Sequence, residues 1–185
     1  VRWKGINMAD TRGPSIVQNV VSTLHSSAEL PRTAENTANQ EDKVLRVALG
    51  SDHGGFDVKE GLREYLMSLG YRISDVGTDS TESVDYPDFA VKVAKKVASG
   101  ECERGIMIDG AGIGSTMVCN KVRGIRAALC YDMKTISNSR VHNNANVLCL
   151  GGPMHSKAEI YEMVKVWLTT RFEGGRHWPR INKMM

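Results

Sequence analysis

The sequence lacks three features that would assign it to a class of protein directly: a long apolar run, an excess of charge of one sign, and paired cysteines. No run approaches the roughly 20 apolar residues that a membrane-spanning helix needs, so we expect no membrane segment. The formal net charge is +3, and the lysines and arginines are scattered among acidic residues. This pattern indicates no nucleic-acid-binding surface.

The four cysteines, Cys102, Cys119, Cys130 and Cys149, include no C-x-x-C pair, and three of them fall in segments that we expect to be buried. We interpret them as reduced core thiols, which indicates a reducing compartment, the cytoplasm, rather than a disulfide scaffold. The five histidines are dispersed along the chain and predict no zinc set. We therefore expect neither a metal nor a cofactor.

From residue 44 onward, apolar segments alternate with amphipathic ones. Gly70, Gly100 and Gly124 fall where helices should end. The alternation predicts an α/β fold with a mostly parallel sheet covered by helices on both faces. The expected strands are 44–49, 71–76, 105–109, 125–130 and 146–150, and the expected helices are 57–69, 88–99, 113–121, 132–141 and 156–170.

A glycine-rich loop follows the apolar segment that ends at Asp109. Glycine leaves main-chain N–H groups open to a ligand, and such amides at the start of a helix favour a phosphate or an enolate oxygen. The alternative is a tight strand-to-helix turn without a ligand, because the spacing matches neither a dinucleotide fingerprint nor a Walker motif. The loop reads Gly110-Ala111-Gly112-Ile113-Gly114-Ser115.

A second polar cluster follows the first expected strand and contains Asp52 and His53. Ligands of open parallel sheets collect at the carboxyl ends of strands, so this pair and Asp109 could share one crevice. The alternative is a helix-capping aspartate beside a surface histidine.

Several motifs occur together and in order along the chain. They are Gly50-Ser51-Asp52-His53-Gly54-Gly55-Phe56, Asp85-Tyr86-Pro87, the Gly110–Gly114 loop, Asn120-Lys121, Gly124-Ile125-Arg126, His142-Asn143 and Glu173-Gly174-Gly175-Arg176-His177. With these motifs the chain resembles the type B ribose-5-phosphate isomerases, a family that also contains galactose-6-phosphate isomerase subunits, over residues 44–182. The resemblance implies a Rossmann-like three-layer α/β/α sandwich with a five-stranded sheet. It also implies a homodimer or homotetramer and metal-free isomerisation of ribose 5-phosphate to ribulose 5-phosphate.

Such an isomerase needs a base that reaches the carbon beside the carbonyl, donors for the oxyanion, and a group that opens the sugar ring. We expect the amides of Gly110, Gly112, Ile113, Gly114 and Ser115 to be the donors. The family most often has a cysteine where this chain has Asp109, and some relatives have a glutamate where it has Ser115.

Asp109 is the only ionisable residue on the loop and is therefore our candidate base, although amides that stabilise an oxyanion also stabilise a carboxylate. The family's threonine after the first loop glycine is Ala111 in this chain. These two changes leave three readings open: an altered substrate, a different arrangement of the base, or lost activity.

The resemblance also implies roles for residues outside the loop. His142 would open the ring, with Asn143 bonded to an enediolate oxygen, and the alternative for His142 is a structural helix cap. Tyr86 would hold sugar hydroxyls, and Asp52 would orient His53 or a ring hydroxyl of the sugar.

The phosphate would be bound by Arg176 and Arg180, together with His53, at a site assembled with the partner subunit. The alternative for the two arginines is a solvated basic tail. Two rival functions remain: a sugar-phosphate-binding protein without turnover or with altered specificity, and a nucleotide-binding module, for which the glycine spacing is incomplete.

Residues 1–43 form an extension before the isomerase domain, which we place at 44–185. A capping box at Ser15 and a one-sided apolar pattern predict an amphipathic helix over about 15–25, followed by a polar linker. This arrangement resembles cargo of bacterial microcompartments, so we expect residues 14–25 to bind shell or cargo proteins there. The alternatives are a misread upstream frame, an organellar presequence, which the acidic residues disfavour, and a helix packed on the dimer.

Overall fold

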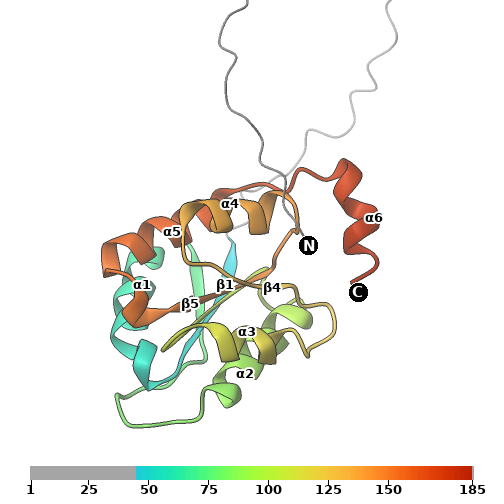
Figure 1. The fold of residues 1–185 in the computed structure, drawn as a ribbon. Coiled ribbons are helices and arrows are strands. Elements are labelled where there is room, and N and C mark those ends of the chain that lie inside the picture. Colours follow the sequence, from blue (N-terminus) through green and yellow to red (C-terminus); the bar gives the residue numbers. More distant parts are fainter. Residues whose placement is uncertain (1–44, 185) are drawn as a thin grey trace, which may run out of the picture. The chain divides into compact units, whose positions relative to one another are not determined.

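The computed structural model describes residues 45–184, in which strands and helices alternate along the chain (Figure 1). The strands are β1 (Arg46–Ser51), β2 (Arg72–Asp75), β3 (Arg104–Asp109), β4 (Ala127–Leu129) and β5 (Val147–Gly151). The helices are α1 (Phe56–Ser68), α2 (Tyr86–Ala98), α3 (Ile113–Cys119), α4 (Met133–Val141), α5 (Lys157–Thr169) and α6 (Trp178–Ile181). Short 3-10 turns are η1 (His53–Gly55), η2 (Gly152–Met154) and η3 (Gly175–His177).

The five strands form one sheet in the order β2-β1-β3-β5-β4, and every pairing in the described part of the chain is parallel. Register aligns the ends of the central strands, because Ser51 pairs with Ile108 and Asp109 pairs with Gly151. The α/β fold with a parallel five-stranded sheet is confirmed. The carboxyl ends of β1, β3 and β5 therefore lie side by side.

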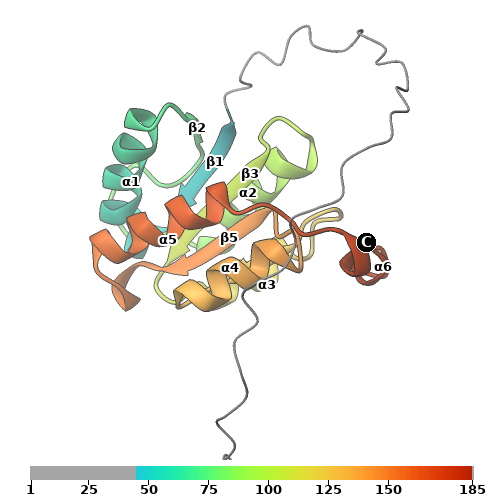
Figure 2. The same ribbon diagram turned by 90° about the horizontal axis from the view of Figure 1, so that it is seen from above.

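Side chains of the strands alternate between two buried layers, as parallel strands covered on both faces require. Val47 and Leu49 belong to a core that also contains residues of α1, α4 and α5, whereas Ala48 belongs to a core with α2 and α3. Figure 1 shows α2 and α3 on one side of the sheet, and Figure 2 shows α5 between α1 and α4 on the other. The expected three-layer sandwich is confirmed.

Most predicted boundaries lie within two residues of the observed ones, and Gly70, Gly100 and Gly124 all have a positive φ at the predicted breaks. Strand β4 is shorter than predicted, and α6 was missed because four residues are too few to show helical periodicity. All four cysteines are buried and free, as expected. The predicted extension 1–43, including its helix over 15–25, lies outside the described residues. Within residues 45–184, the helices are too short or too polar to cross a membrane.

Candidate active site

The carboxyl ends of β1 and β3 bring the two predicted polar clusters together. The Asp52 amide donates to the Ile108 carbonyl oxygen over 3.2 Å, so the turn after β1 rests on the end of β3. A Cβ at position 55 would lie 2.3 Å from the same oxygen, so only glycine fits between this turn and the end of β3. Asp52 also caps this turn by accepting from the Gly55 amide at 3.1 Å, so the capping role that we considered as an alternative is present as well.

Asp52 is a buried carboxylate close to a second one. Burial is the main cause that raises the pKa of Asp52 above its ordinary value, and the negative charge of Asp109 raises it further. The Gly55 amide acts in the opposite direction. The structure thus places Asp52 and Asp109 close together at the carboxyl ends of β1 and β3.

Asp109 is 4% exposed and is surrounded by hydrogen-bond donors of its own loop. Its Oδ1 accepts from the amides of Ala111 (2.8 Å) and Gly112. Its Oδ2 accepts from the amide (3.3 Å) and the hydroxyl of Ser115. The loop amides thus bind the carboxylate of Asp109, the residue immediately before the loop.

The amides of Gly112 and Ser115, which we expect to hold the substrate oxyanion, bond to the Asp109 carboxylate in this structure. The amides of Ile113 and Gly114 lie in the first turn of α3, where N–H groups have no acceptor within the helix. For Gly112 or Ser115 to hold an oxyanion, the substrate oxygen must replace Asp109 as the acceptor.

Gly112 shapes this loop because it is the N-cap of α3 and has a φ of 75°. A Cβ there would lie 2.6 Å from the Leu129 side chain and 3.0 Å from the Leu150 carbonyl carbon. No other residue type fits both the space and the left-handed backbone.

Tyr86 and His53 also lie at this edge, as predicted. The Tyr86 ring packs against the glycine loop, since a Cβ on Gly114 would be 2.5 Å from its hydroxyl oxygen. The exposed His53 accepts the Val84 amide at Nδ1 over 3.2 Å, which leaves its Nε2–H for another partner. Tyr86 and His53 therefore lie beside the glycine loop and the turn after β1, respectively.

His142 and Asn143 lie at the opposite edge of the sheet. They connect the end of α4 to the start of β5, and His142 is the C-cap residue of α4, the structural role that was our alternative. Strand β5 pairs with β3 from Val147 to Gly151, a length of about 13 Å that separates this edge from Asp109. The two predicted catalytic residues, Asp109 and His142, therefore do not meet within one chain.

The C-terminal segment that contains Arg176, His177 and Arg180 packs near His142 and not near Asp109. The His142 ring stacks on His177 with 4.6 Å between ring centroids, and Arg176 and Arg180 lie beside His177, both exposed. The Asn138 side-chain nitrogen lies 2.9 Å from His142 Nδ1, and Asn138 Oδ1 accepts from the side-chain nitrogen of Asn143 at 3.3 Å.

The buried Arg140 and the partly buried Arg126 hold the loop that carries His142. Arg140 donates to the main-chain oxygens of Thr170 and Ala145 and to Asn144 Oδ1. Burial, together with two neighbouring arginines, lowers the pKa of Arg140 to about 10. Arg126 donates to the main-chain oxygens of Asn143 and Asn144. These bonds fix the loop, and a sequence pattern does not reveal them.

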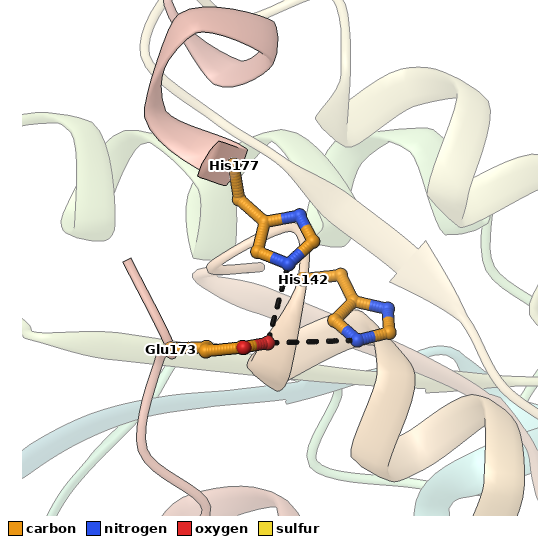
Figure 3. Close-up of side chains that lie close together, drawn as sticks. All are labelled: His142, Glu173 and His177. Atoms are coloured by element: carbon orange, nitrogen blue, oxygen red, sulfur yellow. Dashed lines mark hydrogen bonds and ion pairs between the residues drawn. The ribbon is translucent and has the colours of Figure 1, made fainter. Parts of the chain in front are cut away.

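Sequence reasoning also missed the partners of His142. Glu173 and His177 were part of a quoted motif, but we assigned a role only to its arginine. The structure places one ligand atom each of His142, Glu173 and His177 within 4.8 Å of one another (Figure 3). Dispersion along the chain therefore did not keep these side chains apart in space.

Comparison with known proteins identifies a family and named relatives for this chain. The family described as Ribose/Galactose Isomerase matches residues 47–184. Ribose-5-phosphate isomerase B of Escherichia coli is 40% identical over 138 residues, which are 75% of this chain and 93% of that protein. D-erythrulose-4-phosphate isomerase of Pectobacterium atrosepticum is 37% identical over 142 residues, 76% of this chain and 93% of that protein.

The solved structure of Clostridium thermocellum ribose-5-phosphate isomerase B superposes with a TM-score of 0.75 at 46% identity, covering 76% of this chain and 95% of that one. Sequence and structure agree over the same part of the chain, which contains both edges of the sheet described above. The chain therefore belongs to the ribose/galactose isomerase family.

Proposed function

We propose that this protein is an aldose–ketose isomerase that converts ribose 5-phosphate to ribulose 5-phosphate without a metal. The observation that carries the proposal is the meeting of Asp109, Asp52 and Tyr86 around the glycine loop at one sheet edge. The chain belongs to a family whose relatives are named as isomerases of phosphorylated sugars.

In this proposal Asp109 is the base. It removes the proton from C2 of the open-chain aldose, and the negative charge moves to the carbonyl oxygen, giving a cis-enediolate. The same carboxyl returns the proton to C1, the hydroxyl on C2 gives up its proton to become the ketone, and the oxygen on C1 takes up a proton to become a hydroxyl. Because loop amides now bond to Asp109, they must exchange this carboxylate for the substrate oxygen as the charge moves.

A second copy of the chain completes the site in this proposal. His142, Asn143, Arg176 and Arg180 lie at the amino edge of the sheet, so they cannot act on a sugar bound at Asp109 of the same chain. A homodimer or homotetramer in which one copy's amino edge faces the other copy's carboxyl edge would supply ring opening and phosphate binding. Size measurement by light scattering, with turnover followed upon dilution, tests this arrangement.

One observation favours a second candidate, a sugar-phosphate-binding protein with altered specificity or without turnover. Both carboxylate oxygens of Asp109 are occupied by hydrogen bonds, so neither is open to a proton on carbon, and the family's threonine is replaced by Ala111. A relative named for a four-carbon substrate shows that substrate size varies among similar chains.

A coupled assay with ribose 5-phosphate, allose 6-phosphate and erythrulose 4-phosphate separates the candidates. We expect turnover of ribose 5-phosphate that Asp109→Asn removes, while calorimetry still detects binding of the sugar phosphate. Glu162→Gln, the same chemical change on the exposed face of α5, is the matched control. Binding of all three sugars without turnover of any would establish the non-catalytic candidate.

We propose, further, that the protein lies in the cytoplasm and that residues 14–25 direct it into a bacterial microcompartment. The capping box and the one-sided apolar pattern of this segment support the proposal. A chain lacking residues 1–30 should lose its localisation in a host that forms the compartment, whereas unchanged localisation and assembly would refute the idea.

A further inference from the structure

The amino edge of the sheet carries a cluster of two histidines and a glutamate that the proposed reaction does not use as a unit. His142 ends α4, His177 ends η3, and Glu173 lies in the segment between α5 and η3. Figure 3 shows both imidazole rings with a nitrogen directed at the Glu173 carboxylate. We propose that His142, Glu173 and His177 bind a divalent transition-metal ion, with zinc as the representative ion.

The distances between the donor atoms fit such an ion. Glu173 Oε2 lies 3.2 Å from His177 Nε2 and 3.9 Å from His142 Nε2, and all three atoms lie within 4.8 Å of one another. Ligands of a tetrahedral zinc ion, with bonds of about 2.0–2.1 Å, are separated by roughly 3.3 Å. Shifts of about an ångström or less would therefore bring the three atoms onto one ion.

Hydrogen bonding alone explains only part of the cluster. The contact between His177 and Glu173 is a hydrogen bond, but 3.9 Å between His142 and Glu173 is too long for one. A shared cation between the three side chains would engage His142 Nε2 and the carboxylate together. Two imidazoles and a carboxylate are also the protein ligands of open zinc sites, in which water takes the fourth position.

The main chain holds the three ligands near one another before any ion binds. The Glu173 amide donates to the Val141 carbonyl oxygen over 3.0 Å, which ties Glu173 to the residue before His142. The His177 amide donates to Gly174 over 3.0 Å. The His177 side chain is 6% exposed, whereas those of His142 and Glu173 are 40% and 54% exposed. One ligand is thus anchored and two face solvent, so an ion and its water can enter.

Asn138 supplies the outer contact that a metal-binding histidine needs. Its side-chain amide lies 2.9 Å from His142 Nδ1. When Nε2 binds an ion, Nδ1 carries the proton and requires an acceptor, which the Asn138 oxygen becomes when the amide rotates and gives up its bond from Asn143. The same amide serves the metal-free ring as a donor.

Metal binding would also regulate the activity proposed above, and this consequence rests on the proposed function. His142 is the residue that we expect to open the sugar ring, and an ion on its Nε2 would occupy the lone pair that exchanges the proton. Zinc would therefore inhibit the isomerase, and a chelator would restore it.

The test is calorimetric titration of the full chain with Zn²⁺ after treatment with a chelator, together with the visible absorption of the Co²⁺ form. We expect one ion per chain and the intense bands of four-coordinate cobalt. Glu173→Gln and His177→Gln should each weaken the affinity at least about tenfold. His155→Gln and Glu162→Gln, which lie outside the cluster, should bind like the unmodified chain.

Because the His177 side chain is buried, His177→Gln can fail to fold, whereas Glu173 is exposed. In that case the zinc affinity of Glu173→Gln alone tests the proposal. Equal affinity of Glu173→Gln and the unmodified chain, or no binding of zinc by the unmodified chain, would overturn the proposal. The titration does not depend on turnover, so an inactive chain that binds zinc through these residues would refute the isomerase and leave the metal site in place.

Discussion

Replacement of Asp109 by asparagine tests whether the charge of this side chain organises the glycine loop. The carboxylate accepts from the amides of Ala111, Gly112 and Ser115 and from the Ser115 hydroxyl. Asparagine has the same shape but presents one acceptor oxygen and an NH₂ group. If the oxygen stays with Ala111 and Gly112, the NH₂ group faces the Ser115 amide, and two donors oppose each other.

The magnitude follows from the bonds that change. A hydrogen bond to a charged group contributes about 1.5–3 kcal/mol, and the Ser115 amide loses its acceptor, while the Ser115 hydroxyl can rotate to accept from the NH₂ group. Relief of repulsion with Asp52, whose pKa the charge of Asp109 helps to raise, returns part of the loss. We expect Asp109→Asn to lower the free energy of unfolding by about 2–4 kcal/mol.

Chemical denaturation of the full chain measures this difference. The midpoint should fall with an unchanged slope, because the surface exposed on unfolding is the same. Glu162→Gln, on the exposed face of α5, should change the free energy of unfolding by less than about 0.5 kcal/mol. An Asp109→Asn chain as stable as the unmodified one would show that the charge does not hold the loop.

The same variant tests the proposed base. A carboxamide cannot take a proton from carbon, so we expect turnover of ribose 5-phosphate to fall by about 10²–10⁴-fold. Exchange of solvent deuterium into the sugar should fall in parallel. Undiminished exchange would assign the proton transfer to another group.

Three further changes probe the two edges of the sheet. Burial raises the pKa of Asp52 in the folded state above its ordinary value of 3.8. The ionised carboxylate therefore destabilises the fold at a pH above the raised pKa, and this effect disappears at a pH below 3.8. Denaturant titrations should show that Asp52→Asn raises the free energy of unfolding at pH 7 but hardly at pH 3.5. Gly112→Ala places a Cβ against strand β5 at a φ of 75°, so thermal unfolding should show a free energy of unfolding lower by at least about 2 kcal/mol. Gly110→Ala is the control, because the space around its Cβ is open, and it should lower the same quantity by less than about 1 kcal/mol. Arg140→Lys keeps a charge but cannot reach all three acceptors, so denaturation should show a loss of about 2–3 kcal/mol, and equal stability would refute the bonding assigned to this side chain.

Much of the fold was predictable because its signals are local. Strands appear as short apolar runs, helices as amphipathic segments, and the breaks between them as glycines such as Gly70 and Gly100, which have the expected positive φ. The meeting of Asp52 and Asp109 was also predictable, because parallel strands end at the same edge.

The position of His142 had a signal that we did not use. It lies between a predicted helix and the next predicted strand, and in a parallel sheet that connection crosses the amino edge. The separation of His142 from Asp109 follows from this topology. The sequence only partly indicated that the loop amides would bond to Asp109. Amides that can hold an oxyanion can equally hold a neighbouring carboxylate, so the glycine pattern does not say which anion they bind.

The order of polar and apolar residues by itself determined the alternating elements, the parallel sheet and the meeting of Asp52 and Asp109 at its carboxyl edge, since these depend on periodicity and on where strands end. Tertiary structure decided which side chains meet: four donors on Asp109, and His142 with Glu173 and His177. Such meetings depend on side-chain direction and on packing between segments distant in the chain, which residue spacing does not encode.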